Sequence, residues 1–343
     1  MNFNDFDKQE EIVMTLEEEQ SHKKHFSKIC IAFIAYLVTT QILGYLASYF
    51  LPELLFKSET TSLIIGSAIQ YLLALPAFYW IIKDLPATSP IKTNLSGKEF
   101  IKLTSVSVFL MYVGNYISVI IMTAIEEKFG AVPENSLDSI LSGDNYLLTI
   151  ILVGIVAPIV EEFIFRKLLI DRLNPYGEKI AVLFSAFIFG LLHINLYQFF
   201  YAFLIGAVLS VIYVKTGKII YTIIIHCFIN LFFGVFSSYL FSLLDIEQLL
   251  EYAYEGIVPE EYLIANAEAL SLYGIYMVVF YAMLIMGIFN LNKQIFSLRF
   301  RKGTVLFPKG KTLEVIFFNT GAVILISICL ILTAISMFSF AIT

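Results

Sequence analysis

Long apolar runs alternate with short polar and charged segments along most of the chain. A helix needs roughly 20 apolar residues to cross the hydrocarbon core of a bilayer. The runs are continuous and lack the weak apolar–polar alternation of barrel strands, so they predict helices. The nine predicted spans cover about 29–51, 61–82, 100–124, 146–170, 178–195, 197–215, 218–244, 271–291 and 314–341. The two around Asn195 meet almost without a loop, so the pattern predicts eight to nine spans.

Composition supports a membrane protein. Of the 343 residues, 59% are hydrophobic and 15% are charged, and the formal net charge is −6. Soluble globular proteins are typically about 45–50% apolar and about 25% charged. Cys30, Cys227 and Cys329 lie inside apolar runs and form no CxxC pair, which gives no sign of a zinc knuckle or a disulfide framework. The predicted fold is therefore an all-α, polytopic transmembrane bundle in a lipid bilayer, and nucleic-acid binding is excluded.

The charges predict the domain organisation and the orientation. Residues 1–28 are acidic and then basic without an apolar region ending in small residues, so they predict a cytoplasmic polar tail rather than a signal peptide. Residues 29–343 then form a single transmembrane domain. Lys and Arg concentrate in even-numbered loops, whereas the third and seventh loops are acidic. Because cytoplasmic loops carry an excess of Lys and Arg, this alternation places the N-terminus inside. The seventh loop also predicts a short surface helix around 245–254.

The fourth span contains charged residues inside the membrane, where burying a charge costs free energy. It reads Ala-Pro-Ile-Val-Glu-Glu-Phe-Ile-Phe-Arg over 157–166. Glu162 and Arg166 lie four residues apart and can pair on one helical face. Glu161 points about 100° away from Glu162. Pro158 lacks an N–H and predicts a locally opened helix beside the carboxylates. Ionisable groups inside a span suggest function, although snorkelling to the cytoplasmic end is the alternative.

Two histidines lie inside neighbouring spans. His193 ends the fifth span, and His226 shares a helical face with Asn230 in the seventh. A single buried histidine is more often a satisfied core residue, but two histidines, an asparagine and an unpaired Glu161 together favour a site. Small residues Ala202, Gly206 and Ser210 recur every four positions in the sixth span and predict close helix packing.

These side chains suit two kinds of hydrolysis. A carboxylate and a histidine can take a proton from water, and a histidine and an amide can donate hydrogen bonds to an oxyanion. Alternatively, Glu161, His193 and His226 could hold a catalytic Zn²⁺ with water as the fourth ligand. The HExxH spacing of soluble zinc proteases is absent. The cofactor is therefore either none or zinc, and the sequence leaves the choice open.

The three motifs resemble those of a known family. Glu-Glu-x-x-x-Arg at 161–166, Phe-x-x-x-His at 189–193 and His-x-x-x-Asn at 226–230 are similar, in order and placement, to the motifs of CAAX protease and bacteriocin-processing proteins. This family includes type II CAAX prenyl endopeptidases and bacterial Abi proteins. The resemblance covers about 146–240, the motif-bearing core of the transmembrane domain.

The resemblance implies a role for each motif residue. Glu161 would be the general base, assisted by His193. His226 and Asn230 would hold the oxyanion, while Glu162 and Arg166 would support the site.

The resulting hypothesis is a multi-pass intramembrane endopeptidase in a bacterial plasma membrane. Its substrate would be a peptide or a membrane-protein segment, cut near the cytoplasmic side. The main alternative is a non-proteolytic scaffold, such as a bacteriocin-immunity or regulatory protein that keeps the site as a binding pocket. A transporter would favour paired, inverted broken helices, and the sequence shows one Pro-broken span.

Overall fold

The computed structural model describes residues 14–55, 58–130, 141, 145–244, 246–297 and 299–338. Across these ranges the regular elements are all helices, apart from an isolated bridge between Gly177 and Lys302. The predicted all-α class is therefore confirmed. Residues 1–13 of the predicted tail, most of the predicted third loop and the last residues of the ninth predicted span lie outside the described residues.

Eight helical stretches in the described part of the chain are long and apolar enough to cross a membrane. They are Leu16–Phe50, Glu59–Ile82, Gly97–Phe129, Tyr146–Tyr176, Leu196–Thr216, Ile219–Leu243, Ala267–Asn292 and Thr320–Met337. The remaining predicted span, 178–195, is the helix α10 (Glu178–Leu191) of 14 residues. At 1.5 Å per residue it reaches only about 21 Å, short of a full crossing. The N-inside orientation stays a prediction.

The first helix, α1 (Leu16–Phe50), begins well before the predicted span. Thr15 accepts a hydrogen bond from the Glu18 backbone, and the Glu18 carboxylate accepts one from the Thr15 backbone. This reciprocal capping box starts the helix inside the charged segment. Phe26, which the sequence placed in the polar tail, is fully buried, so the charged turns of α1 are packed against the bundle.

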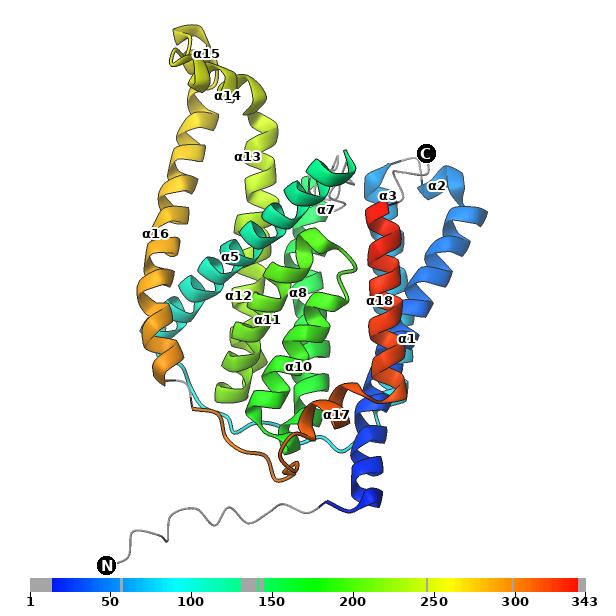
Figure 1. The fold of residues 1–343 in the computed structure, drawn as a ribbon. Coiled ribbons are helices and arrows are strands. Elements are labelled where there is room, and N and C mark those ends of the chain that lie inside the picture. The colour runs from blue at the N-terminus through cyan, green and yellow to red at the C-terminus, as the bar shows by residue number, and fades with distance from the viewer. Residues whose placement is uncertain are drawn as a thin grey trace, which may run out of the picture.

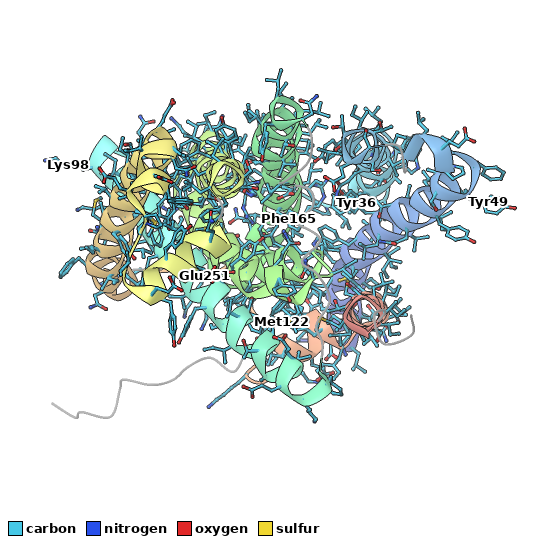
Figure 2. All side chains as sticks on the ribbon, turned by 90° about the horizontal axis from the view of Figure 1, so that it is seen from above. Tyr36, Tyr49, Lys98, Met122, Phe165 and Glu251 are labelled. Atoms are coloured by element: carbon cyan, nitrogen blue, oxygen red, sulfur yellow. The ribbon has the colours of Figure 1, made fainter. Side chains whose placement is uncertain are left out.

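The centre of the bundle is a helical hairpin. α10 packs against α11 (Leu196–Thr216), and α11 packs against α5 (Gly97–Phe129), which in turn contacts α16 (Ala267–Ser297). On the other side, α1 packs against α4 (Leu75–Ile82) and α18 (Thr320–Phe338). In Figure 1 the α10–α11 turn ends below the tops of α3 and α13. Seen from above, Phe165 lies between Tyr49 of α1 and Lys98 of α5 (Figure 2).

Close packing holds the hairpin together. A Cβ on Gly206 of α11 would lie 2.9 Å from Cδ1 of Phe189 on α10, closer than ordinary van der Waals contact. The predicted packing role of the small residues in this span is therefore confirmed for Gly206. Phe189 also belongs to the larger apolar core, where its ring meets that of Phe165 at 4.9 Å.

Wide helical turns interrupt three of the helical stretches in the described part of the chain, at four places. These π-helical segments are η1 (Ile69–Ala74), η2 (Ile150–Val156), η3 (Phe163–Ile170) and η5 (Ile229–Phe236). Pro158 lies in the α8 turn (Ala157–Glu162) between η2 and η3. The predicted local opening around Pro158 therefore takes the form of π-turns within a continuous helix. Such turns are rare and occur frequently at functional sites.

The remaining helices are short or connect the spans. The predicted surface helix of the seventh loop is present as α14 (Ile246–Glu255). The others are α2 (Pro52–Leu55), α3 (Glu59–Ala68), α7 (Tyr146–Thr149), α9 (Asp171–Leu173), η4 (Asn174–Tyr176), α12 (Ile219–Phe228), α13 (Ser237–Leu243), α15 (Glu260–Ala265) and α17 (Thr312–Phe317).

Candidate active site

A fully buried ion pair forms the base of the candidate site. Arg166 Nε donates to Glu162 Oε2 at 2.9 Å, and Arg166 Nη2 donates to Oε1 at 3.3 Å. Both side chains are 0% exposed. The predicted pairing across four residues is thus present, in the two-point geometry that suits a guanidinium and a carboxylate. A buried pair of this kind is tolerated only when the other donors and acceptors also find partners.

Two serines from the central hairpin complete the coordination of Arg166. Its Nη1 donates to Ser185 Oγ on α10 at 2.9 Å and to Ser210 Oγ on α11 at 3.0 Å. Ser185 in turn donates to the Phe165 carbonyl at 3.1 Å. The sequence assigned Ser210 to packing alone and did not identify Ser185. Their signal was weak, because a serine in a span is usually satisfied by its own helix.

Glu162 also binds a histidine. His226 Nδ1 lies 3.0 Å from Glu162 Oε1, so the carboxylate serves Arg166 and His226 together. Because a carboxylate accepts, Nδ1 carries the proton and Nε2 is left for chemistry. The carboxylate therefore fixes the orientation of the ring. The sequence predicted the pairing of Glu162 with Arg166 but not this second contact with His226.

Glu161 faces away from this pair, as the helical geometry predicted. Its side chain is 30% exposed, and its Oε2 lies 3.7 Å from His226 Nε2. The gap exceeds a direct hydrogen bond but leaves the two groups adjacent. Glu161 also interacts electrostatically with His193, Tyr36 and Tyr71. It is therefore the carboxylate that two histidines share.

His193 is held at the end of α10 by its own helix. Its Nδ1 lies 2.7 Å from the Phe189 carbonyl oxygen, so Nδ1 donates and Nε2 is left as an acceptor. Ile194 follows with a φ of 51°, a left-handed conformation that is a genuine outlier for a β-branched residue. Asn195 then caps α11 by accepting from the Tyr197 N–H at 2.9 Å. The turn that presents His193 is thus fixed on both sides.

Phe189 lies between the two histidines. The centroid of its ring is 5.0 Å from that of His193 and 5.9 Å from that of His226, both edge-on. The Arg166 guanidinium carbon lies 5.4 Å from the same ring centroid. This one buried side chain therefore contacts residues from all three helical motifs and fixes their spacing.

Asn230 satisfies a carbonyl group that Pro158 leaves without a donor. In the π-helical segment η2 the Ala157 N–H donates to the Leu152 carbonyl, and Pro158 has no N–H for the Val153 carbonyl. Asn230 Nδ2 supplies the missing donor at 3.0 Å. An amide nitrogen carries two hydrogens, so one donor of Asn230 is left for a ligand. The structure gives Asn230 a structural partner that the sequence did not predict.

The donor geometry does not match the zinc alternative. Among the described residues, no group of three His, Cys, Asp or Glu side chains is arranged to hold a metal ion. Glu161 and His226 are adjacent, but His193 does not complete a ligand set with them. The hydrogen bonds at Nδ1 of both histidines would leave only their Nε2 atoms as metal donors.

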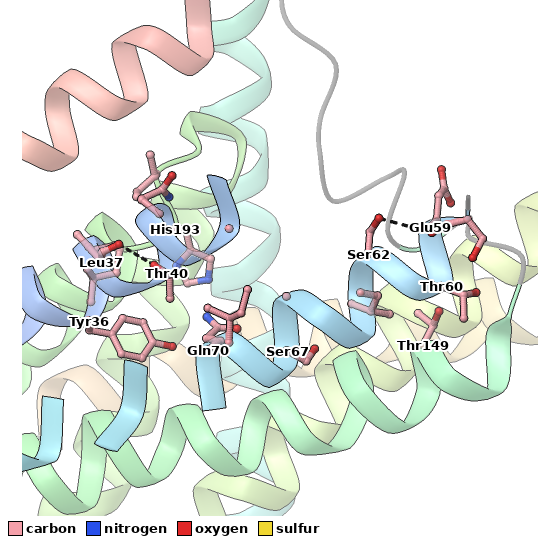
Figure 3. Close-up of a pocket in the computed structure, with 18 residues that line it drawn as sticks. Tyr36, Leu37, Thr40, Glu59, Thr60, Ser62, Ser67, Gln70, Thr149 and His193 are labelled. Carbon is pink, nitrogen blue, oxygen red and sulfur yellow. Dashed lines mark hydrogen bonds between the residues drawn. The ribbon is translucent and has the colours of Figure 1, made fainter. Parts of the chain in front are cut away.

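A cavity of about 710 Å³ reaches the site from one side. It lies between α1, the α3–η1 helix, α7 and the turn after α10, and His193 forms part of its wall. Tyr36 and Gln70 line its inner part (Figure 3). The other motif residues do not line the cavity. The sequence did not predict which residues line this cavity. A single polar residue in an apolar span does not show which other helix it faces.

Comparison with known proteins supports the resemblance. Residues 143–232 match the family model described as type II CAAX prenyl endopeptidase Rce1-like. The chain is 28% identical over 218 residues to the membrane-embedded CAAX protease MroQ of Staphylococcus aureus (strain USA300), covering 57% of this chain and 87% of the relative. It is 25% identical over 128 residues to the UPF0177 protein YxdF of Lactococcus lactis subsp. lactis (strain IL1403), covering 37% of this chain and 71% of the relative. No solved structure matches the chain.

The matched region contains all three motifs. Residues 143–232 include the carboxylate pair, Arg166, both intramembrane histidines and Asn230. The apolar helices and the bacterial relatives fit a multi-pass protein of the plasma membrane. The predicted resemblance of this motif-bearing core to the CAAX protease and bacteriocin-processing family is therefore confirmed.

Proposed function

We propose that the chain is an intramembrane endopeptidase in which Glu161 activates the water that hydrolyses a peptide bond. The observation that carries this proposal is the relation of Glu161 to His226. Glu161 is partly exposed and lies 3.7 Å from His226 Nε2, while Glu162 holds Nδ1 of the same ring. A base beside an oriented histidine is the arrangement that general acid–base catalysis requires.

The proton path follows from these distances. Glu161 takes a proton from water as the oxygen adds to the carbonyl carbon of the substrate, giving a tetrahedral intermediate. The proton then passes to His226 Nε2, and the ring becomes an imidazolium whose Nδ1–H stays on Glu162. His226 next donates this proton to the departing amide nitrogen as the carbon–nitrogen bond breaks. The products are a carboxylic acid and an amine, and His226 and Glu161 return to their starting states.

The other two polar groups complement this path. His193 Nε2 can accept a hydrogen bond from the attacking water, because Nδ1 is bound to Phe189. The second N–H of Asn230 can donate to the oxyanion, together with protonated His226. No step of this mechanism uses a metal ion.

The proposal is tested by peptide cleavage with purified protein in lipid nanodiscs. The probe is a mixed library of fluorogenic decapeptides, and released termini are identified by mass spectrometry. Glu161→Gln keeps the size of the side chain and should lower the rate by about 10²–10⁴. Glu127→Gln, an exposed glutamate on α5, is the matched control and should leave the rate unchanged. Equal rates for wild type and Glu161→Gln would refute the role of Glu161.

A chelator distinguishes the two hydrolytic mechanisms. Because the described donors do not converge on a three-ligand site, we expect the rate to be insensitive to chelation and to added zinc. Stoichiometric zinc in the purified protein, lost together with activity in His193→Ala, would establish the metal mechanism instead.

Substrates in cells are sought by comparing membrane peptides from cells that carry wild type or Glu161→Gln. Peptides that appear only with wild type would identify the cleaved segments. If the variant changes neither peptides nor library cleavage, the non-proteolytic scaffold becomes the better account.

A further inference from the structure

The cavity beside His193 is an elongated groove between two helices. α1 packs closely against η1 and α4 but diverges from α3, and the cavity fills the gap. Figure 3 shows His193, Thr40 and Tyr36 toward one end and Ser62, Thr60 and Glu59 toward the other, with Gln70 and Ser67 between them. The groove therefore leads along α3 to the candidate active site.

Polar and small residues line both helical walls of the groove. On α1, Thr40, Gln41 and Gly44 recur at helical spacing, and on the facing helix Glu59, Ser62, Gly66 and Gln70 do the same. A helix that turned the Gln41 amide or the Glu59 carboxylate to lipid would place a polar or charged group in hydrocarbon, which is costly. Cβ atoms built on Gly44 and Gly66 would meet nothing within 4 Å. The two stripes thus face open space and not each other.

Exposure changes along the groove. Glu59, Ser62 and Gly66 are exposed, Gln70 and Tyr36 are half-buried, and Leu37 is buried. The open end therefore lies at the start of α3, and the closed end lies near His193. α3 begins close in the chain to the end of α1, so the groove opens on the face of the molecule opposite the start of α1.

We propose that this groove binds an extended peptide segment and delivers its scissile bond to the site of His193 and Glu161. This inference rests on the proposed proteolysis and names the form of its substrate. From Ser58 to Gln70 the helix rises about 18 Å at 1.5 Å per residue. An extended chain rises about 3.3 Å per residue, so the groove accommodates about five residues. Its volume of about 710 Å³ falls within the usual range for ligand pockets, about 300–1,000 Å³.

The lining selects a peptide over a lipid tail. Hydroxyl and amide groups of Thr40, Gln41, Ser67 and Gln70 line the groove, and an extended backbone offers N–H and C=O groups to each. Thr40 already donates to the Leu37 carbonyl, but an acyl chain offers no partner to the exposed amide of Gln41.

Charge restricts the peptide further. Glu59 is the one Asp, Glu, Lys or Arg among the described lining residues, and Glu161 lies beyond the other end. Two carboxylates at the ends of the groove repel acidic side chains. The preferred segment is therefore uncharged or basic. If the loop charges predict the orientation correctly, this segment arrives from outside the cell, and the cut would not lie near the cytoplasmic side.

Photocrosslinking tests the groove without requiring cleavage. The probe is a biotinylated decapeptide library with one benzophenone side chain, applied in nanodiscs to the wild-type protein, which keeps both carboxylates. Crosslinks are mapped by mass spectrometry. We expect them on 36–44 and 58–70, and we expect basic or neutral peptides to crosslink at least about tenfold more than acidic ones, a difference of about 1.4 kcal/mol.

Filling the groove provides the matched comparison. Gly66→Phe and Gly44→Phe place a ring in open space and should lower crosslinking about tenfold or more. Gly274→Phe on α16, where a Cβ also meets nothing within 4 Å, should leave crosslinking unchanged. Crosslinks elsewhere, or crosslinks that survive both groove substitutions, would overturn the proposal. So would groove labelling by a photoreactive phospholipid that the peptides cannot displace.

The experiments distinguish a failure of the proposed proteolysis from a failure of the proposed peptide binding in the groove. Groove crosslinks without any cleavage by wild type would reject proteolysis and retain peptide binding. Cleavage that is abolished by Glu161→Gln but unaffected by Gly66→Phe would retain proteolysis and reject the groove.

Discussion

Glu162 Oε1 accepts a hydrogen bond from His226 Nδ1 at 3.0 Å while the same carboxylate is paired with Arg166. One buried side chain therefore connects the fourth span to the seventh and sets the tautomer of a histidine. Its neighbour Glu161 is left to interact with the opposite nitrogen of that ring. Two consecutive glutamates thus take different roles because a helix turns them to different partners.

The first prediction concerns the stability of the buried pair. Arg166→Met leaves Glu162 charged, buried and without its guanidinium, which should lower the free energy of unfolding by about 3–5 kcal/mol. Thermal unfolding in detergent measures the change. The double variant Glu162→Gln/Arg166→Met removes both charges and should recover part of the loss. A single variant as stable as wild type would show that the pair does not support the fold.

The second prediction separates the two roles of Asn230. Asn230→Ala leaves the Val153 carbonyl without its donor, which should cost about 1–3 kcal/mol of stability. It also removes the proposed oxyanion donor, which should lower the rate by about 10²–10³. Unfolding and decapeptide cleavage are measured on the same preparation.

Pro158→Ala offers a matched rescue for that variant. An alanine at 158 restores the N–H that a π-turn directs at the Val153 carbonyl. The double variant Pro158→Ala/Asn230→Ala should therefore regain stability but not rate. If it regains both, Asn230 acts on the fold alone.

The third prediction concerns the polar contact between α1 and α17. Hydrogen bonds from Lys23 and Lys311 lower the pKa of Glu314 to about 2, from an ordinary value of 4.5. A depressed pKa stabilises the folded state above the unfolded value, and this stabilisation is lost as pH falls from about 4.5 through about 2. Hydrogen exchange of the α17 amides should rise over that window. In Glu314→Gln the rise should be absent, and a rise of the same size in both proteins would contradict the assignment.

The fourth prediction concerns topology. The loop charges place Glu255 outside and Arg301 inside. After replacement of the three native cysteines, an impermeant thiol reagent added to intact cells should label Glu255→Cys and not Arg301→Cys. Lysed cells should show labelling at both positions. The reverse pattern in intact cells would invert the orientation.

Much of the fold could be predicted because each span carries its own signal. Apolar length located the spans, and the spacing of Glu162 and Arg166 predicted their contact from helical geometry alone. Helix ends were harder, since the capping box at Thr15 starts α1 inside a charged segment. The predicted span 178–195 was also longer than the helix α10, which ends at Leu191. The apolar run continues beyond that point, but the backbone turns at Ile194.

Contacts between spans were not predictable from spacing. The sequence placed His226 in the candidate site, but its hydrogen bond to Glu162 depends on how two helices are rotated about their axes. Ser185 reaches Arg166 across 19 residues and Ser210 across 44. Asn230 binds the Val153 carbonyl because Pro158 has no N–H and the π-turn leaves that carbonyl without a backbone donor.

The π-helical turns also set the rotational phase of the helix that carries both carboxylates. A π-turn accommodates an extra residue, and each residue of an α-helix turns the chain by about 100°. Deleting one residue within Ile150–Val156 would let that stretch relax to ordinary α-helix. The helix beyond it would keep its phase, because the wide turn holds the extra residue within the same full rotation. The same deletion in an ordinary α-helical turn would rotate everything beyond it by about 100°, the angle that separates Glu161 from Glu162. The wide turns are thus the places where this helix can lose a residue without exchanging which glutamate faces His226.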